Sequence, residues 1–155
     1  RNTYYTNIIL RDSSSMYIIS TAHGGDSIDV VNNCEKKYKD YMGWRNVDTL
    51  IYVSYNFKDN NILRNDPFIV IGEDAIAIID NDNDVMTYNT KPRYALVCNG
   101  FKGNIIDVYK TISPDTILLS KDLNKRRINR YIDSCATHKI PFISLREKGF
   151  YKRVK

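Results

Sequence analysis

The sequence is poor in the residues that build metal and redox sites. Its 155 residues include two histidines, His23 and His138, and three cysteines, Cys34, Cys98 and Cys135. Neither histidine has a possible ligand at i+2 or i+4, and no cysteine pair has CxxC spacing. These spacings exclude the common zinc and thiol redox motifs. The cysteines are typical of buried small apolar residues, and the question of a disulfide stays open.

Long apolar runs and nucleotide or nucleophile motifs are also absent. No apolar run exceeds five residues, whereas a membrane-spanning helix needs roughly 20. The sequence contains no G-x-S-x-G elbow and no P-loop. It has no signal-peptide leader, and Arg1 as the first residue suggests a domain cut from a larger protein or a processed chain. We expect residues 1–155 to form a single soluble domain that is a fragment of a longer protein.

Positive charge is concentrated at the end of the chain. The whole chain has a net charge of +5. Residues 121–155 contain eleven Lys or Arg and three Asp or Glu, a net charge of +8, so residues 1–120 carry a net charge of −3. A positive segment of this kind favours partners that carry phosphate groups.

The first half of the chain has the pattern of antiparallel hairpins. Runs rich in aromatic and β-branched residues alternate with polar, turn-forming segments. One stretch instead has apolar residues three or four positions apart, which predicts an amphipathic helix. The predicted elements are strands at 3–10 and 16–22 around a turn at 11–15, a helix from Asp26 or Ser27 to about Gly43, a strand at 48–55, a loop with at most one helical turn at 57–67, strands at 67–72 and 74–80, and a polar turn at 81–92.

The second half predicts a β-α-β-α-β unit. Its three apolar runs are typical of parallel strands that are covered on both faces. The strands are expected at 93–98, 116–120 and 140–145, and the helices at 105–112, before Ser113-Pro114, and from Ser120 or Asp122 onward. We therefore expect an α/β fold with a mixed sheet or sheets, in which N-terminal antiparallel hairpins precede a C-terminal β-α-β-α-β unit.

Two short polar segments resemble metal-binding motifs without completing them. HGGD (23–26) offers one His and one Asp, but its Gly-Gly pair favours a surface turn. NDNDV (81–85) has the acids of a calcium loop and lacks the glycine and the closing Glu of that motif, so we interpret it as a turn. Functional residues of parallel α/β sheets lie in the loops at the carboxyl ends of strands. The first such loop here, CNGFKGN (98–104), contains no His and no acid.

The basic helix is the one positive signal for a partner. Lys125, Arg126, Arg127 and Arg130 lie mostly opposite its predicted apolar stripe. Clustered Lys and Arg bind phosphate backbones through counterion release, so these four residues are our candidate DNA contacts. The twelve tyrosines offer surfaces on which bases can stack, although most of them alternate within strands and are expected to pack. A charged outer face is also the ordinary state of a helix on a soluble domain.

The end of the chain resembles a known family. Residues 120–151, SKDLNKRRINRYIDSCATHKIPFISLREKGFY, resemble the terminal stretch of the ComEC competence proteins, which are inner-membrane channels for DNA uptake in transformation. In that family a strand ending in serine leads to a basic helix and then to a gIPf and an ekGay pattern. The matching segments here are Ile140-Pro141-Phe142, Arg146-Glu147-Lys148-Gly149 and Phe150-Tyr151, and the runs 4–20 and 93–100 resemble the opening hairpin and a later strand of the same region.

The resemblance implies a scaffold without its usual chemistry. In many ComEC proteins this region is a metallo-β-lactamase-like domain with a proposed nuclease role, in which a strand is followed by His-x-His-x-Asp-His metal ligands. The matching segment here, 98–104, lacks these ligands, and the family's Asp-Val-Gly-x-Gly-Asp motif is also missing. The resemblance therefore implies a reduced metallo-β-lactamase-like domain with no catalytic residue, no metal ligand and no cofactor.

The same resemblance implies a place and partners for the chain. It implies a non-catalytic, soluble, extracytoplasmic C-terminal domain of an inner-membrane DNA-uptake protein. The expected partners are the remainder of the parent protein and single-stranded DNA, and no small-molecule substrate is evident.

Two other functions stay open. The chain can be a metal-dependent hydrolase or nuclease domain whose ligands lie outside the recognised motif. It can also be a protein-interaction or assembly domain whose basic face meets anionic lipid or another subunit, or whose hairpin edges pair with another chain. Stoichiometric bound metal together with chelator-sensitive nuclease activity would favour the enzyme.

Overall fold

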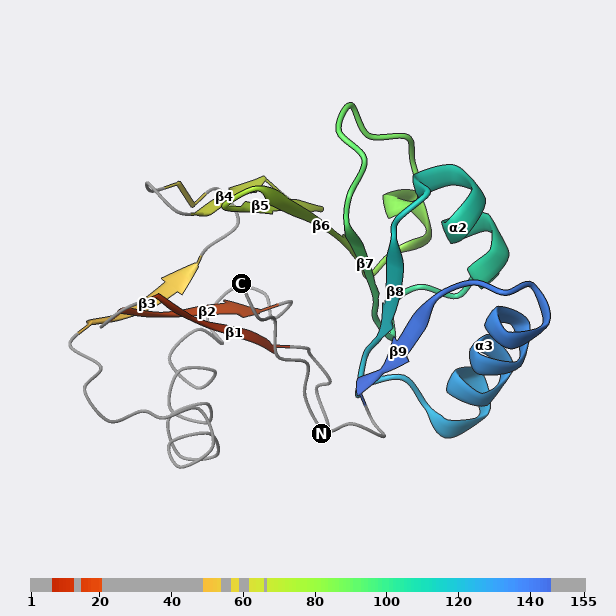
Figure 1. The fold of residues 1–155 in the computed structure, drawn as a ribbon. Coiled ribbons are helices and arrows are strands. Elements are labelled where there is room, and N and C mark those ends of the chain that lie inside the picture. The colour runs from red at the N-terminus through yellow and green to blue at the C-terminus, as the bar shows by residue number, and fades with distance from the viewer. Residues whose placement is uncertain are drawn as a thin grey trace. The chain divides into compact units, whose positions relative to one another are not determined.

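The computed structural model describes residues 7–12, 15–20, 49–53, 57–58, 62–65 and 67–145 of the chain. The chain forms two compact units, Arg1–Phe57 and Lys58–Lys155. Within the described ranges each unit contains one β-sheet, and Figure 1 shows the strands of both sheets.

The first unit holds a three-stranded sheet in the order β1-β2-β3. β1 (Asn7–Asp12) and β2 (Ser15–Ser20) pair antiparallel, which confirms the predicted hairpin. The turn is shorter than predicted, because the hydrogen-bonded ladder continues through polar residues that had indicated a turn. β3 (Thr49–Val53) confirms the strand predicted there and runs parallel to β2. The helix predicted within residues 26–43 lies outside the described residues.

The second unit holds a six-stranded mixed sheet in the order β4-β5-β6-β7-β8-β9. β4, β5 and β6 pair antiparallel, and β6, β7, β8 and β9 are parallel to one another. The strands are β4 (Ile62–Asn65), β5 (Phe68–Ile71), β6 (Asp74–Ile79), β7 (Tyr94–Val97), β8 (Thr116–Leu119) and β9 (Phe142–Ser144). This arrangement confirms the α/β class, the second antiparallel hairpin and the C-terminal β-α-β-α-β unit.

The prediction of a loop at 57–67 is wrong, because part of this segment forms the edge strand β4. The strand has only four residues, and half of them are polar, so its composition indicated a loop. Its side chains nevertheless alternate between buried and exposed positions, beginning with buried Ile62. Pairing with β5 satisfies backbone groups of β4, an effect that composition does not reveal. Short polar strands are common at sheet edges, where they discourage pairing with other chains.

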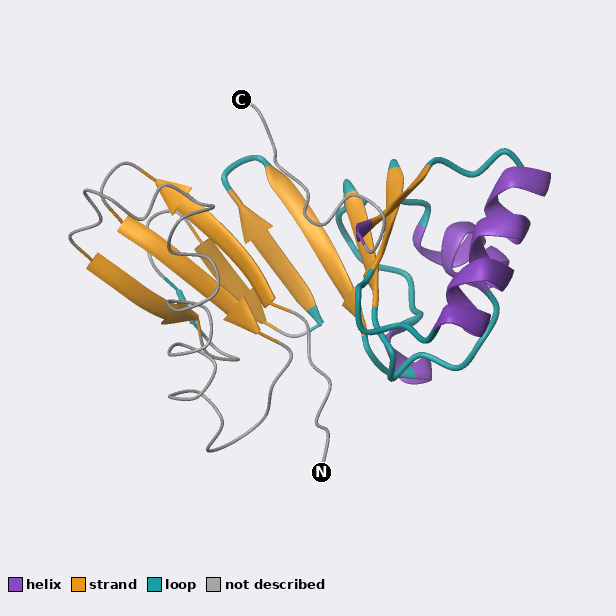
Figure 2. Ribbon diagram, turned by 90° about the horizontal axis from the view of Figure 1, so that it is seen from below, coloured by secondary structure: helices purple, strands orange, loops and turns teal. Residues whose placement is uncertain are grey.

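Helices α2 (Ile105–Ile112) and α3 (Lys125–Thr137) connect β7 to β8 and β8 to β9. Figures 1 and 2 show both helices on the same face of the parallel strands. β-α-β crossovers are right-handed, and these three strands follow one another in order across the sheet, so both connections must cross on the same side. Both helices therefore begin near the edge at which β7 and β8 end.

The main core lies between the two helices and the sheet. Every second residue of β6, β7 and β8 faces the helices, as the period of a strand requires. The sheet contributes Ala77, Ile79, Ala95, Val97, Ile117 and Leu119, and the helices contribute Ile105, Val108, Ile112, Ile128, Tyr131 and Cys135. Burial of each large apolar side chain stabilises the fold by about 1.5–3 kcal/mol.

Helix α3 begins later than the sequence predicted. Asn124 is its N-cap residue, and the Oδ1 atom of Asn124 accepts the amide hydrogen of Arg127 at 2.8 Å. The predicted start at Ser120 or Asp122 is wrong, since Ser120 is buried directly after β8 and the Asp122 carboxylate accepts an amide hydrogen from Asn99. Of the helices within the described ranges, none has the length and apolar character that a membrane crossing requires.

The turn between β5 and β6 depends on Gly72. The register pairs Ile71 with Asp74, so only Gly72 and Glu73 form the loop. The φ angle of Gly72 is +59°, a left-handed value that costs a residue with a Cβ about 1–2 kcal/mol. Glycine at the first of two loop positions is the pattern of a type II′ turn, whose twist matches that of the flanking strands.

We predict that Gly72→Ala lowers the free energy of unfolding by about 1–2 kcal/mol. No atom lies within 4 Å of the point that a Cβ would occupy at Gly72, so the cost comes from the backbone angle alone. Gly72→Asn should cost less, because asparagine tolerates positive φ better. Urea denaturation of the two variants measures the difference, and an alanine variant as stable as the original chain would contradict the prediction.

Candidate functional site

Three segments that leave parallel strands lie side by side at one edge of the second unit's sheet. β6, β7 and β8 pair in register up to their last residues. The chain therefore leaves the sheet at three neighbouring points, as the segments 80–84, 98–104 and 120–124. In parallel α/β sheets this carboxyl edge is where binding and catalytic residues gather.

Carboxylates from both flanking segments accept the amide hydrogens of the loop 98–104. Two carboxylates come from the segment after β6, which forms the 3₁₀ helix η2 (Asp82–Asp84), and one comes from the segment after β8. The donor–acceptor pairs are Gly100 N to Asp80 Oδ1 at 3.0 Å, Lys102 N to Asp82 Oδ1 at 2.8 Å and Asn99 N to Asp122 Oδ1 at 3.1 Å. Each hydrogen bond to a charged group contributes about 1.5–3 kcal/mol.

The turn at 80–84 is closed by its own last acid. The Oδ2 atom of Asp84 accepts the amide hydrogen of Asp80 at 3.0 Å. The hydroxyl of Tyr88 donates to the carbonyl oxygen of Asp84 at 2.7 Å. Burial, with a smaller effect from the charge of Asp84, raises the pKa of Tyr88 from 10.0 to about 12, so this hydroxyl stays a hydrogen-bond donor even in alkaline solution. The interpretation of NDNDV as a turn is confirmed, and its acids hold backbone groups.

Gly100 brings two segments into direct backbone contact. A Cβ placed on Gly100 would lie 1.9 Å from the carbonyl oxygen of Asp80. No real Cβ atom approaches an oxygen so closely, and backbone cannot move aside as a flexible side chain can. The loop can therefore lie against the segment after β6 only because residue 100 is glycine.

Arg127 binds the opposite, carbonyl side of the same loop. It lies in the first turn of α3 and is half-buried. Its Nη1 atom is 2.7 Å from the carbonyl oxygen of Asn99, 3.1 Å from the side-chain Oδ1 of Asn99 and 3.2 Å from the carbonyl oxygen of Phe101. One guanidinium thus joins the start of α3 to the loop after β7.

Tyr131 adds a second link from α3 to the loop. Its hydroxyl donates to the carbonyl oxygen of Gly103 at 2.9 Å, and its ring lies against that of Phe101 with the centroids 6.3 Å apart. Burial raises the pKa of Tyr131, and the neighbouring Arg130 and Arg127 lower it in part. The carbonyl groups of three loop residues are therefore bound by α3.

Cys98, Cys135 and His138 are the cysteines and the histidine among the described residues. Cys98 and Cys135 are buried and form no disulfide. Burial raises the pKa of the Cys135 thiol to about 11, whereas a nucleophilic cysteine has a lowered pKa. His138 is exposed at the end of α3, with Nδ1 3.0 Å from the carbonyl oxygen of Ser134. His23 lies outside the described residues.

Across 67–145 and the shorter described segments, no group of three His, Cys, Asp or Glu side chains is placed to hold a metal ion. The three acids nearest the loop 98–104 accept backbone amide hydrogens, which accounts for their presence at this edge of the sheet.

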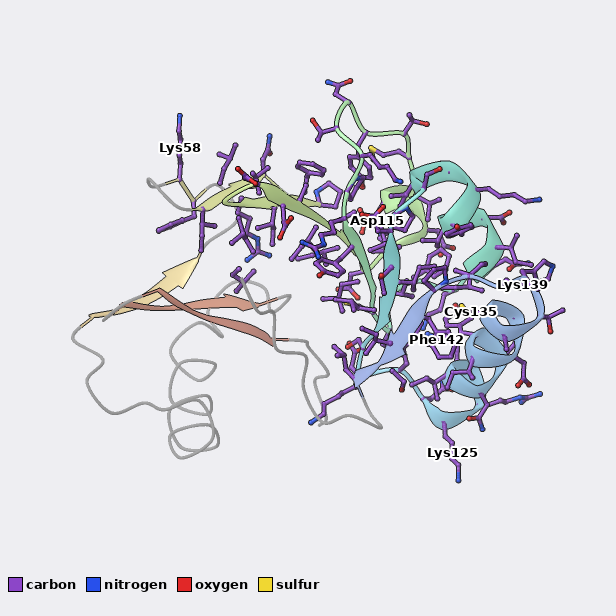
Figure 3. All side chains as sticks on the ribbon, viewed as in Figure 1. Lys58, Asp115, Lys125, Cys135, Lys139 and Phe142 are labelled. Atoms are coloured by element: carbon purple, nitrogen blue, oxygen red, sulfur yellow. The ribbon has the colours of Figure 1, made fainter. Side chains whose placement is uncertain are left out.

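The four predicted DNA contacts divide into two groups. Lys125, Arg126 and Arg130 are exposed, and we call these three residues the basic face of α3. Arg127 points toward the loop instead, as its hydrogen bonds show. Figure 3 shows the Lys125 side chain extending away from the unit at the start of the helix, while Cys135 lies among the packed side chains. The guanidinium carbon of Arg130 is 5.5 Å from the centroid of the Tyr131 ring, a cation–π distance that holds this arginine against the helix.

The first turn of α3 carries three positive residues and no acid. The amino terminus of a helix has a partial positive charge, so cations there are unfavourable by about 0.3–1 kcal/mol each. Arg127 offsets this cost with its hydrogen bonds to the loop. Among the described residues, Lys125 and Arg126 form no ion pair, and the single acid of α3 is Asp133.

Sequence reasoning did not identify the acids that bind the loop. Asp80 and Asp122 follow closely after the strands on either side of β7. An acid that follows one parallel strand can reach the loop that follows the neighbouring strand. The position of Asp80 and Asp122 soon after predicted strands was therefore the sequence signal for their contact with the loop. The role of Arg127 gave no signal, because the register of the helix against the loop is a tertiary feature.

Nearly the whole chain matches a family model. The family model described as the ComEC C-terminal domain matches residues 2–155, which is nearly the whole chain. No curated protein and no solved structure matches the chain. The likeness to a metallo-β-lactamase scaffold therefore stays a prediction.

We predict that Arg127→Met lowers the free energy of unfolding by about 2 kcal/mol, because the carbonyl groups of Asn99 and Phe101 lose a charged donor. The matched control is Arg126→Met, one position earlier on the exposed side of the helix. It loses no contact with the loop and removes a first-turn cation, so stability should stay the same or rise by up to about 1 kcal/mol. Urea denaturation compares the two variants. Equal losses would show that Arg127 does not fasten the loop.

Proposed function

The chain belongs to the family of ComEC C-terminal domains, and from this membership we propose that it is a non-catalytic domain that contacts DNA through the basic face of α3. Membership ties the chain to competence and DNA uptake and makes it part of a larger membrane protein. An extracytoplasmic position and single-stranded DNA as the partner belong to the proposal.

The observation that carries the DNA contact is the exposure of Lys125, Arg126 and Arg130 on one helix. The buried stripe of α3 consists of Ile128, Tyr131 and Cys135, so its outer side is available to a partner. Arg126 and Arg130 are four residues apart, which places them on one ridge of the helix about 6 Å apart along its axis. Positive side chains on one exposed ridge attract a polyanion through counterion release.

The electrostatics of the helix start support the same proposal. Positive residues in the first turn of a helix interact unfavourably with the helix dipole. Sequences depart from such local preferences mostly at functional sites. Arg127 has a structural reason to be there, since it binds the loop 98–104. Lys125 and Arg126 have no such contact among the hydrogen bonds and ion pairs of the described residues, and DNA phosphates would offset their cost.

Support for a non-catalytic role comes from the loop 98–104. This segment contains no His, Asp or Glu. Five of its amide groups already donate: three to carboxylates, that of Phe101 to the carbonyl oxygen of Cys98 and that of Cys98 to the carbonyl oxygen of Ile79. A loop held in this way offers few groups to a substrate. Metal-stimulated nuclease activity of the purified chain, lost on chelation, would contradict this part of the proposal.

We predict that the chain binds single-stranded DNA at low salt and that Arg126→Gln/Arg130→Gln weakens this binding. Each lost phosphate contact reduces the slope of log K against log salt by about 0.7 for single strands, so the double variant should lower the slope by about 1.4. Fluorescence anisotropy over a salt series measures both quantities.

The control for this prediction is Lys58→Gln/Lys110→Gln. It removes the same charge from two exposed positions of the second unit, and Figure 3 shows Lys58 far from α3 within that unit. The control should keep the original slope. Equal slopes for both double variants would mean that only net charge matters, and the absence of low-salt binding would remove the DNA contact.

We also predict that Lys125→Glu stabilises the chain while it weakens DNA binding. An acid at the first helical position interacts favourably with the helix dipole, so the free energy of unfolding should rise by about 0.5–1 kcal/mol. Arg130→Glu, beyond the first turn, should weaken binding without the gain in stability. Thermal denaturation and anisotropy together test this trade-off, which fails if Lys125→Glu destabilises the chain or leaves its DNA affinity unchanged.

A further inference from the structure

The basic face of α3 has charge but no exposed aromatic side chain, and we propose that it binds the phosphodiester backbone alone, without stacking on bases. This inference rests on the proposed function and states which part of the nucleic acid is recognised. It implies that base identity has no effect on the part of the affinity that α3 provides.

The aromatic residue of α3 is unavailable to a base. Tyr131 is 1 % exposed, and its hydroxyl is bonded to Gly103. Phe101, which lies against the Tyr131 ring, is 2 % exposed. A base that stacks needs an open ring face about as large as the base itself, and neither residue presents one.

The same holds for the other aromatic residues between positions 67 and 145. All seven are buried or half-buried, and the half-buried Tyr88, Tyr109 and Phe142 pack against the core cluster. Single-strand binding proteins that stack bases combine a positive groove with open aromatic side chains. The described part of the second unit has the positive charge without the open aromatics.

The arginines are placed to meet phosphates. Arg130 already rests on a ring of its own protein, at 5.5 Å from the Tyr131 centroid, which orients its guanidinium beside the helix. Arg126 lies one helical turn before it, and the step of about 6 Å along the axis of α3 spans about two phosphates of one strand, at about 3.4 Å of duplex axis per phosphate. A row of donors along a convex helix can therefore follow a strand of either a duplex or a single-stranded molecule.

Base recognition by α3 can be tested with oligonucleotides that differ only in their bases. The full chain and Arg126→Gln/Arg130→Gln are each titrated with an oligothymidine, an abasic oligomer of equal phosphate number and a duplex of the same length, at one low salt concentration. We expect the double substitution to weaken binding by the same factor, within about threefold, for the oligothymidine and the abasic oligomer. Stacking of even one base would contribute about fivefold or more in affinity, so it would be detected.

The possible outcomes separate this inference from the proposed function. A loss more than about threefold larger for the oligothymidine than for the abasic oligomer would overturn the inference and leave the DNA contact intact. A double substitution without effect on any of the three ligands would overturn the proposed function itself. Tighter binding of oligothymidine by both proteins, with equal losses on substitution, would assign base contacts to another part of the chain and support backbone binding by α3.

Discussion

The backbone N–H and C=O groups of the loop 98–104 need hydrogen-bond partners at the edge where three parallel strands end side by side. The structure of the second unit depends on this constraint. Backbone N–H and C=O groups that lose water need partners inside the protein. The loop obtains them from three carboxylates, an arginine and a tyrosine. Carboxylates of Asp80, Asp82 and Asp122 accept its amide hydrogens, and Arg127 and Tyr131 donate to its carbonyl oxygens.

This arrangement also explains the start of α3. Asp122 is directed to the loop, so the helix is capped by Asn124. That start places Arg127 on the side that faces the loop and leaves Lys125, Arg126 and Arg130 on the outside. Four basic residues that look alike in the sequence are therefore divided by the fold. One residue fastens the loop to the helix, and the other three are exposed, where the proposed DNA contact would form.

The edge of the sheet at which β6, β7 and β8 end is also relevant to the function of this ComEC C-terminal domain. A hydrolase with this kind of sheet would keep its reactive groups in the loops at the carboxyl ends of the strands. In this chain the acids at that edge are bonded to backbone amides, and the exposed charge lies on a helix beside it. Contact with DNA by charge alone would need no reactive group at the strand ends. The proposed DNA contact and the proposed non-catalytic role are therefore consistent with each other.

The sequence by itself determined the α/β class, both antiparallel hairpins, the β-α-β-α-β unit and the basic character of the last helix, because these follow from the period of apolar residues and from local turn chemistry. It could not determine β4, whose polar side chains indicated a loop and whose strand conformation depends on pairing with β5. It could not separate Arg127 from its neighbours either. Only the tertiary structure decided which basic residue meets the loop and which acids bind its amides, because hydrogen bonds between segments 20 or more positions apart depend on the register of helix, loop and strands rather than on any local pattern.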